Sequence, residues 1–122
     1  MKFILAIDQG TSSTKTIIFD EKGNAVAKGH ADLHTDYFDN GFVEQNPEGI
    51  YQNVLDAILL CLQDFESKGF SIENIVSCGI SNQRETFILW DKSGEPFVPV
   101  VVWVCKRSIH IYQELLNGEY FT

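Results

Sequence analysis

The first run of apolar residues, Phe3 to Ile7, constrains the fold of this chain more than any other feature of its sequence. The run is nearly continuous and ends at the polar turn Asp8-Gln9-Gly10. Such a run is typical of a central β-strand that is buried on both faces. It is too short for the core of a signal peptide or for a membrane span, so we expect no targeting or membrane segment here.

Two further segments predict strands beside the first one. Thr14 to Asp20 is rich in β-branched and aromatic residues, and Glu21 to Asn24 then supplies a turn that contains glycine. A third candidate strand follows from Ala25 to Leu33. The first third of the chain therefore predicts a three-stranded β-meander.

An amphipathic helix is predicted after the meander. Asn46-Pro47 is a typical helix start, because Asn caps free N–H groups and Pro fits the first helical position. Lys68-Gly69 is a typical end, with a cation near the negative end of the helix dipole and a glycine for the left-handed turn. Between them, apolar residues recur at helical spacing, at Ile50, Val54, Ala57, Ile58, Cys61, Leu62 and Phe65. One face of this helix should pack on the sheet.

The second half of the chain predicts shorter elements. We expect strands at Ile75 to Ile80 and Thr86 to Trp90, and a further extended segment across Phe97 to Trp103. Apolar residues at helical spacing then predict a second helix that ends at Asn117-Gly118. This order of elements predicts an α/β fold with a meander at its start instead of a Rossmann βαβ unit.

Length and charge exclude several classes of protein. The 122 residues suffice for one domain, and nine basic against seventeen acidic residues give a net charge of −8. An acidic surface repels phosphate backbones and anionic lipids, so neither nucleic acid nor a membrane is an expected partner.

The three cysteines are odd in number and lack CxxC spacing, which argues against a disulfide framework and a zinc site and favours a reducing cytoplasm. Cys61 and Cys78 are expected to be inert packing residues. Cys105, which stands beside two cations, should have some thiolate character.

The segment from Asp8 to Lys15 carries the strongest chemical signal. A carboxylate at a strand end is followed by a glycine, three hydroxyl residues and a lysine, namely Gly10, Thr11, Ser12, Ser13 and Lys15. Glycine lets a ligand approach the backbone, N–H and hydroxyl groups donate to phosphate oxygens, and a carboxylate can hold a hard cation. A Mg-nucleotide site needs this combination. The alternative is a polar hairpin turn in which Asp8 binds nearby N–H groups, and the segment lacks the GxxxxGK[ST] of a P-loop.

Two later segments offer groups for a polar substrate. Gly79 to Thr86 gathers Asn, Gln, Arg and Glu where one strand ends, and a polyhydroxy substrate needs such fixed donors and acceptors. The alternative is a solvated loop with a surface pair between Arg84 and Glu85. Trp103 could lie against the carbon face of a polyol, or it could be a core residue.

Four blocks, taken in order, resemble the N-terminal domain of the FGGY family of carbohydrate kinases, with the glycerol kinases as the most similar branch. They are Ala6 to Ser13, Gly41 to Pro47, Gly79 to Thr86 and Val102 to Arg107, and they extend over nearly the whole chain. The resemblance implies an actin-like, ribonuclease H-like mixed sheet flanked by helices, one half of a two-domain kinase. It also implies transfer of the γ-phosphoryl group of ATP, with Mg²⁺, to a hydroxyl group of glycerol or a sugar.

The resemblance also implies roles for individual residues. On the nucleotide side it implies Asp8 for Mg²⁺, and Thr11, Ser12, Ser13 and Lys15 for the phosphates. On the acceptor side, Arg84 and Glu85 match the pair that binds the polyol hydroxyls, and Trp103 matches an aromatic wall. Such a site works by positioning and charge neutralisation rather than by covalent catalysis.

Some of the family's features are missing from residues 1–122. The family's catalytic base is an Asp far downstream in a chain of roughly four times this length, so we expect no catalytic base here and no turnover by this chain alone. Val104 stands where glycerol kinases commonly have Gln, and Lys106 where Arg is usual. The Met-His-Gly string typical of xylulokinases is absent.

These departures leave open which polyol or sugar is the acceptor. The competing class is a non-catalytic module that binds nucleotide or phosphate with the same turn. A homo-oligomer of the full-length enzyme also stays open.

Overall fold

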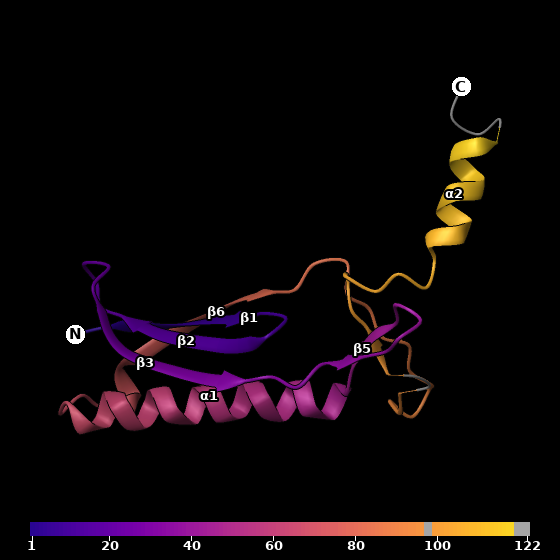
Figure 1. Ribbon diagram of the computed structural model, residues 1–122. Coiled ribbons are helices and arrows are strands. Elements are labelled where there is room, and N and C mark those ends of the chain that lie inside the picture. Colours follow the sequence, from indigo (N-terminus) through magenta and orange to yellow (C-terminus); the bar gives the residue numbers. More distant parts are fainter. Residues whose placement is uncertain (97–98, 119–122) are drawn as a thin grey trace.

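The computed structural model describes residues 1–96 and 99–118 and is built around a four-stranded sheet in the order β3-β2-β1-β6 (Figure 1). The strands are β1 (Phe3–Gln9), β2 (Ser13–Phe19), β3 (Ala25–Asp32) and β6 (Ile75–Asn82). The pairs β1–β2 and β2–β3 are antiparallel, which confirms the predicted meander, whereas β6 runs parallel to β1. The parallel pair brings the carboxyl ends of β1 and β6 together at one edge of the sheet.

Helix α1 (Pro47–Ser67) covers one face of this sheet and confirms the predicted helix. The Oδ1 atom of its N-cap Asn46 accepts hydrogen bonds from the N–H groups of Glu48 and Gly49. The apolar stripe packs Phe65 against the ring of Phe3, with 4.9 Å between ring centroids. The core lies between α1 and the strands and contains Phe3, Leu5, Ile7, Ile18, Ala27, Cys61 and Phe65.

A glycine allows α1 to lie unusually close to β3. A Cβ atom at Gly29 would stand 2.2 Å from the carbonyl oxygen of Ala57 and 2.6 Å from the backbone nitrogen of Cys61. Beside it, the Thr16 hydroxyl donates to the same Ala57 oxygen at 2.7 Å. The helix can therefore approach the sheet only because residue 29 has no side chain.

We expect Gly29→Ala to destabilise the fold by about 3 kcal/mol, because the added methyl group meets backbone atoms that cannot move aside cheaply. Urea unfolding measures the change. Gly79→Ala is the matched control, since Gly79 also lies in a strand and an added Cβ there meets nothing within 4 Å. Equal unfolding midpoints for the two variants would contradict the close packing.

The expectation that the first strand is buried on both faces is wrong. Residues of β1 alternate between buried and exposed, and Ile4 is 48% exposed. The reason is that α1 covers only one face of the sheet, mainly at β2 and β3, and no element within residues 1–96 and 99–118 covers the other. Cys78 on β6 is likewise exposed, which corrects its expected role as a packing residue.

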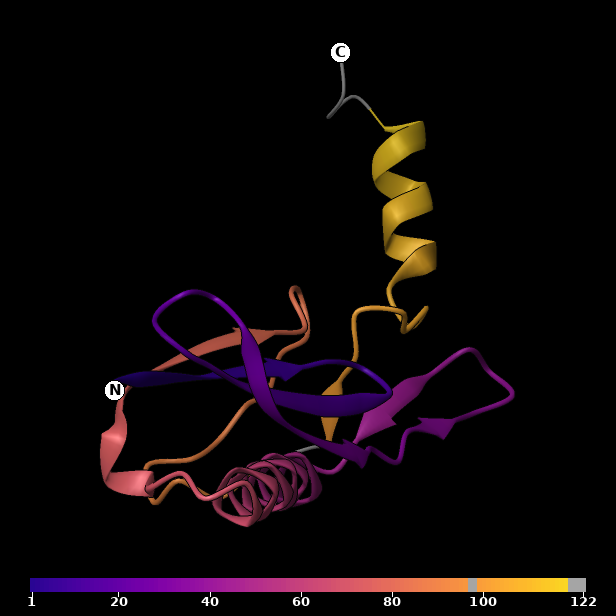
Figure 2. The same ribbon diagram turned by 90° about the vertical axis from the view of Figure 1, so that its left-hand side faces the viewer.

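A second, smaller sheet lies beyond the carboxyl ends of β1 and β6 (Figures 1 and 2). Its strands are β4 (Asp36–Tyr37), β5 (Val43–Gln45) and β7 (Val100–Val101), in the order β4-β5-β7. The expected strand at Thr86 to Trp90 is wrong, because this segment makes only the isolated bridges of Phe87 with Val101 and Trp90 with Pro96. Of the segment expected to be extended, only β7 is a strand, and residues 97–98 lie outside the described residues.

Two short helices complete the described chain. The 3-10 helix η1 (Ile72–Asn74) leads into β6, and α2 (Ile109–Asn117) confirms the predicted second helix. In both views α2 stands clear of the sheets (Figures 1 and 2). Among the described helices, none combines the length and the apolar character that crossing a bilayer requires.

Candidate functional site

The turn from Gly10 to Ser13, here called the hydroxyl turn, connects β1 to β2. It is closed by a hydrogen bond from the Gly10 N–H to the Ser13 carbonyl oxygen at 2.9 Å. A Cβ atom at Gly10 would lie 3.0 Å from that oxygen, so the tight turn favours glycine. The N–H groups of Thr11 and Ser12 donate to no acceptor within residues 1–96 and 99–118. Free N–H groups beside the exposed Ser12 and the half-buried Thr11 and Ser13 can bind a phosphate group.

Asp8 and Lys15 face each other across β1 and β2, and Ser81 of β6 lies beside Asp8 in register. All three line a shallow cavity of about 530 Å³ on the uncovered face of the sheet, whose floor includes Ala6 and Ile17. Asp8 and Lys15 are exposed to solvent. The cavity thus offers an anion and a cation beside the hydroxyl turn.

Asp8 would be a lone protein ligand for a metal ion. No cluster of three His, Cys, Asp or Glu side chains suited to a metal occurs in the part of the chain that the structure describes. Zinc and calcium sites need several protein ligands, whereas Mg²⁺ is commonly held by one or two carboxylates together with water and substrate phosphates. The donor set fits Mg²⁺ that arrives with a nucleotide.

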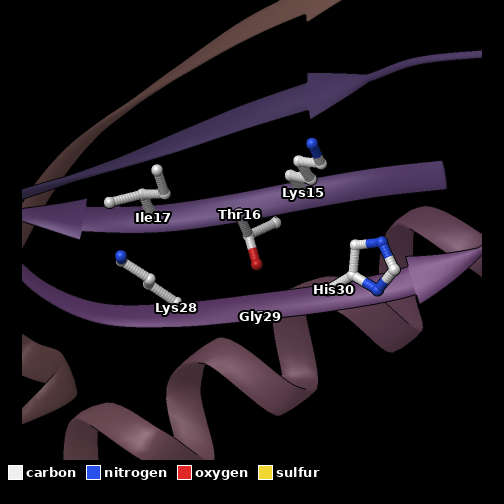
Figure 3. A pocket seen from close by; sticks show the side chains of 6 residues that line it. All are labelled: Lys15, Thr16, Ile17, Lys28, Gly29 and His30. Atoms are coloured by element: carbon white, nitrogen blue, oxygen red, sulfur yellow. The ribbon is translucent and has the colours of Figure 1, made fainter.

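A second depression, of about 350 Å³, lies next to the first over β2 and β3 (Figure 3). Lys15, Lys28 and His30 surround it, while Thr16 points to α1. On an acidic protein, Lys15 and Lys28 place two cations over β2 and β3, and Lys15 is the one nearer the hydroxyl turn.

The loop from Gln83 to Thr86, here called the polar loop, follows β6 and presents Arg84 and Glu85 to solvent. The alternative of an Arg84–Glu85 surface pair is wrong, because no such ion pair forms within the described residues. Glu85 has a φ of 62°, the one positive φ of a non-glycine residue in residues 1–96 and 99–118. Glu85 thus has a backbone conformation that L-residues rarely adopt, and both charged side chains of the loop are exposed.

Trp103 joins the hydroxyl turn to the polar loop. Its indole Nε1–H donates to the Thr11 hydroxyl at 2.8 Å, and its backbone N–H donates to the Thr86 hydroxyl at 3.1 Å. Trp103 is 55% exposed, so the alternative of a core tryptophan is wrong. Residues from three separate sequence blocks therefore meet at one site, where an exposed aromatic face lies beside charged and hydroxyl groups.

The sequence did not predict the buried contacts of Gln45 and Gln83 under this site. Gln45, from the block that precedes α1, is only 1% exposed and binds both Thr11 and Gln83. Gln83 was expected to contribute to a polar binding loop, but its amide points inward to Gln45. A glutamine at the end of a three-residue strand, next to a helix cap, gives no local signal that its side chain is buried.

Cys105 lies close to Arg107 at the end of the fourth block. The Arg107 Nε–H donates to the Cys105 Sγ atom at 3.0 Å, while the same guanidinium binds Glu44 and lies over the ring of Phe42. Burial raises the pKa of the Cys105 thiol, but the side-chain hydrogen bond from Arg107, backbone hydrogen bonds at Val43 and Arg107 and the charge of Arg107 together outweigh burial, so this pKa lies below its ordinary value. This direction agrees with the thiolate character expected of Cys105.

Iodoacetamide at pH 8 should therefore alkylate Cys105 well before Cys61. Only thiolates react, and the pKa of Cys61 is raised by burial whereas that of Cys105 is lowered. Peptide mapping by mass spectrometry measures both rates. Arg107→Leu should slow the alkylation of Cys105 several-fold by raising its pKa, and an unchanged rate would exclude Arg107 as the cause.

Comparisons with known proteins assign this arrangement to a family. The N-terminal domain of the FGGY family of carbohydrate kinases matches residues 3–120. Glycerol kinase of Halothermothrix orenii is 42% identical over 118 residues, which are 96% of this chain and 23% of that protein. Glycerol kinase 1 of Thermotoga maritima is 45% identical over 115 residues, which are 93% of this chain and 23% of that protein.

Solved structures agree with these sequence comparisons. Plasmodium falciparum glycerol kinase with ADP matches with a TM-score of 0.84 and 30% identity, over 97% of this chain and 23% of that one. A xyloylose kinase from Brucella ovis matches with a TM-score of 0.81 and 30% identity, over 93% of this chain and 23% of that one. The chain thus spans about a quarter of the length of the relatives it matches.

Proposed function

The chain belongs to the FGGY family of carbohydrate kinases, and from this premise we propose that it supplies the N-terminal half of the active site of an ATP-dependent kinase. The proposed acceptor is a hydroxyl group of glycerol or of a related polyol or sugar. The observation that carries the proposal is the 2.8 Å hydrogen bond between Trp103 and Thr11, because it brings the predicted acceptor side and the predicted phosphate side together. We propose the cytoplasm as the location of the enzyme.

On the nucleotide side, the hydroxyl turn receives the phosphates of ATP. The free N–H groups of Thr11 and Ser12 and the hydroxyl of Ser13 donate to phosphate oxygens, and Lys15 balances their charge. Asp8 holds Mg²⁺, directly or through water. When bound, the ion neutralises the charge that the phosphates carry during transfer.

On the acceptor side, the polar loop and Trp103 bind the polyol. Arg84 donates to hydroxyl oxygens and Glu85 accepts from hydroxyl hydrogens, which matches the two functions of each acceptor hydroxyl. The exposed indole face of Trp103 packs on the carbon chain. Together these contacts hold the reacting hydroxyl near the γ-phosphate, so the chain contributes to the reaction by positioning and charge.

The general base is proposed to lie outside these 122 residues, together with the second domain of the kinase. Relatives are about four times as long as this chain, which supports a two-domain enzyme of which residues 1–122 form the N-terminal domain. The separate 122-residue chain should therefore bind ligands weakly and transfer no phosphoryl group. Phosphoryl transfer by the separate chain would contradict this division of the site.

A panel of acceptors tests the proposed function. The full-length kinase should use ATP and Mg²⁺ to phosphorylate glycerol with a higher kcat/KM than it shows for pentuloses, because the relatives that are 42% and 45% identical to the chain are glycerol kinases. A pentulose is the second candidate, since a xyloylose kinase is as similar in sequence as the glycerol kinase with ADP, at 30% identity each. A higher kcat/KM for a pentulose would select that candidate, and nucleotide binding without transfer to any acceptor would favour the non-catalytic module.

A further inference from the structure

A buried amide lies between the hydroxyl turn and the polar loop. The Gln45 Nε2 group donates to the Thr11 carbonyl oxygen and to the Thr35 hydroxyl, both at 2.7 Å, and its Oε1 atom accepts from the Gln83 Nε2 group at 2.8 Å. A carbonyl oxygen can only accept, so the NH₂ group of Gln45 must face Thr11. Both amide hydrogens of Gln45 and its oxygen are thus used, and the orientation of the side chain is determined by its partners.

The same chain of hydrogen bonds returns to the hydroxyl turn through Trp103. The Gln83 Oε1 atom accepts from the Thr86 hydroxyl at 3.0 Å, and Thr86 in turn accepts from the Trp103 backbone N–H at 3.1 Å. The Trp103 indole donates to the Thr11 hydroxyl at 2.8 Å. Every donor in this closed ring faces an acceptor, and the ring joins one residue or more from each of the four sequence blocks. The ring therefore links the hydroxyl turn to the polar loop through hydrogen bonds on both sides.

We propose that Gln45 is a positioning residue that sets the separation between the nucleotide phosphates and the acceptor, and that couples the binding of the two. This inference rests on the proposed function. Gln45 is buried and its side chain binds Thr11, Thr35 and Gln83, so it would touch neither substrate. In-line transfer requires a fixed distance and alignment between the acceptor oxygen and the phosphorus atom. A shift of about 1 Å can lower the rate about 100-fold.

The test compares Gln45→Met with Asn53→Leu in the full-length protein. Both changes replace an amide by an apolar side chain of similar size, and each amide makes three hydrogen bonds. Asn53 is buried between α1 and the sheet, where it binds Thr14 and the carbonyl oxygens of residues 31–32, outside the ring. It is therefore a control for the general loss of a buried amide.

Three quantities are measured: the Tm, the kcat and KM values for ATP and glycerol, and the glycerol Kd with and without a non-hydrolysable ATP analogue. The wild type should bind glycerol about fivefold or more tightly when the analogue is present. Gln45→Met should remove this difference, so that the glycerol KM at saturating ATP rises by about the lost factor, and it should lower kcat about 10-fold or more. Asn53→Leu should lower the Tm to a similar extent and leave both the coupling and kcat within about twofold of the wild type.

The outcomes separate the two proposals. A wild-type protein that transfers no phosphoryl group to any acceptor refutes the proposed function, and the inference with it. An active wild type without coupling, or a Gln45→Met variant that behaves like Asn53→Leu, overturns the role of Gln45 alone. If Gln45→Met does not fold, Gln83→Leu is the second variant, because it removes the hydrogen bond to Gln45 at the half-buried Gln83. Gln83→Leu must then show the same loss of coupling. Retained coupling in that variant overturns the inference.

Discussion

Replacing Arg84 with Ala should raise the KM for the acceptor about 100-fold, while the KM for ATP changes less than threefold. The guanidinium is exposed in the polar loop, where it makes no ion pair within the described residues, so its charged hydrogen bonds are available to a ligand. A hydrogen bond from a charged group to a substrate hydroxyl contributes about 1.5–3 kcal/mol, which corresponds to a factor of about 10 to 150. Steady-state kinetics of the full-length kinase with glycerol and ATP varied in turn measures the two KM values.

Two controls accompany the Arg84 variant. Arg84→Lys keeps the charge but not the forked donor geometry, so it should recover only part of the affinity for the acceptor. Lys22→Ala removes an exposed cation from the β2–β3 turn and should leave both KM values unchanged. A larger change in the KM for ATP than in that for glycerol would remove Arg84 from the acceptor side.

Asp8→Asn should lower kcat about 1,000-fold and raise the Mg²⁺ concentration that gives half-maximal activity. Asp8 is the carboxylate beside the hydroxyl turn in the cavity that also contains Lys15, and an amide there can no longer balance the charge of a divalent cation. The loss of charge stabilisation acts on the transferring phosphoryl group, so the KM for glycerol should change little. Titration of activity with Mg²⁺ at saturating ATP and glycerol measures the effect.

The control for Asp8 is Asp39→Asn, which removes another exposed carboxylate, from the β4–β5 turn, and should leave activity unchanged. Because Asp8 is exposed, its replacement should also leave the Tm within a few degrees of the wild type. An Asp8→Asn enzyme with full kcat and an unaltered Mg²⁺ requirement would assign the metal to other residues.

The elements that could be predicted from the sequence are those with a strong local pattern. The meander and α1 were predictable because turn glycines, a helix cap and a regular apolar stripe all lie within short windows of sequence. The Thr86 to Trp90 segment was mistaken for a strand because it is a short run of β-branched, aromatic and aliphatic residues, although in the structure only Phe87 and Trp90 pair, each as an isolated bridge. The exposure of Cys78 was not predictable either, since it depends on how much of the sheet α1 covers.

For the candidate site, the kinds of residue were predictable but their connections were not. Asp8, Arg84 and Glu85 could be named from their types and from the family resemblance. The contact between Thr11 and Trp103 joins residues 92 positions apart, and no local pattern carries such a pairing. Gln45 was missed for the same reason, because its burial depends on Thr11 and Gln83, which are 34 and 38 positions away.

The left-handed backbone at Glu85 sets a limit on how far this protein can be made more heat-resistant. A non-glycine residue in this region costs about 1–2 kcal/mol relative to a relaxed conformation, so Glu85→Gly is the kind of change that a screen for thermal stability would select. The same change would delete a carboxylate that the acceptor is proposed to need. Laboratory evolution for stability should therefore be run with simultaneous selection for activity, because at this position the two selections favour different residues.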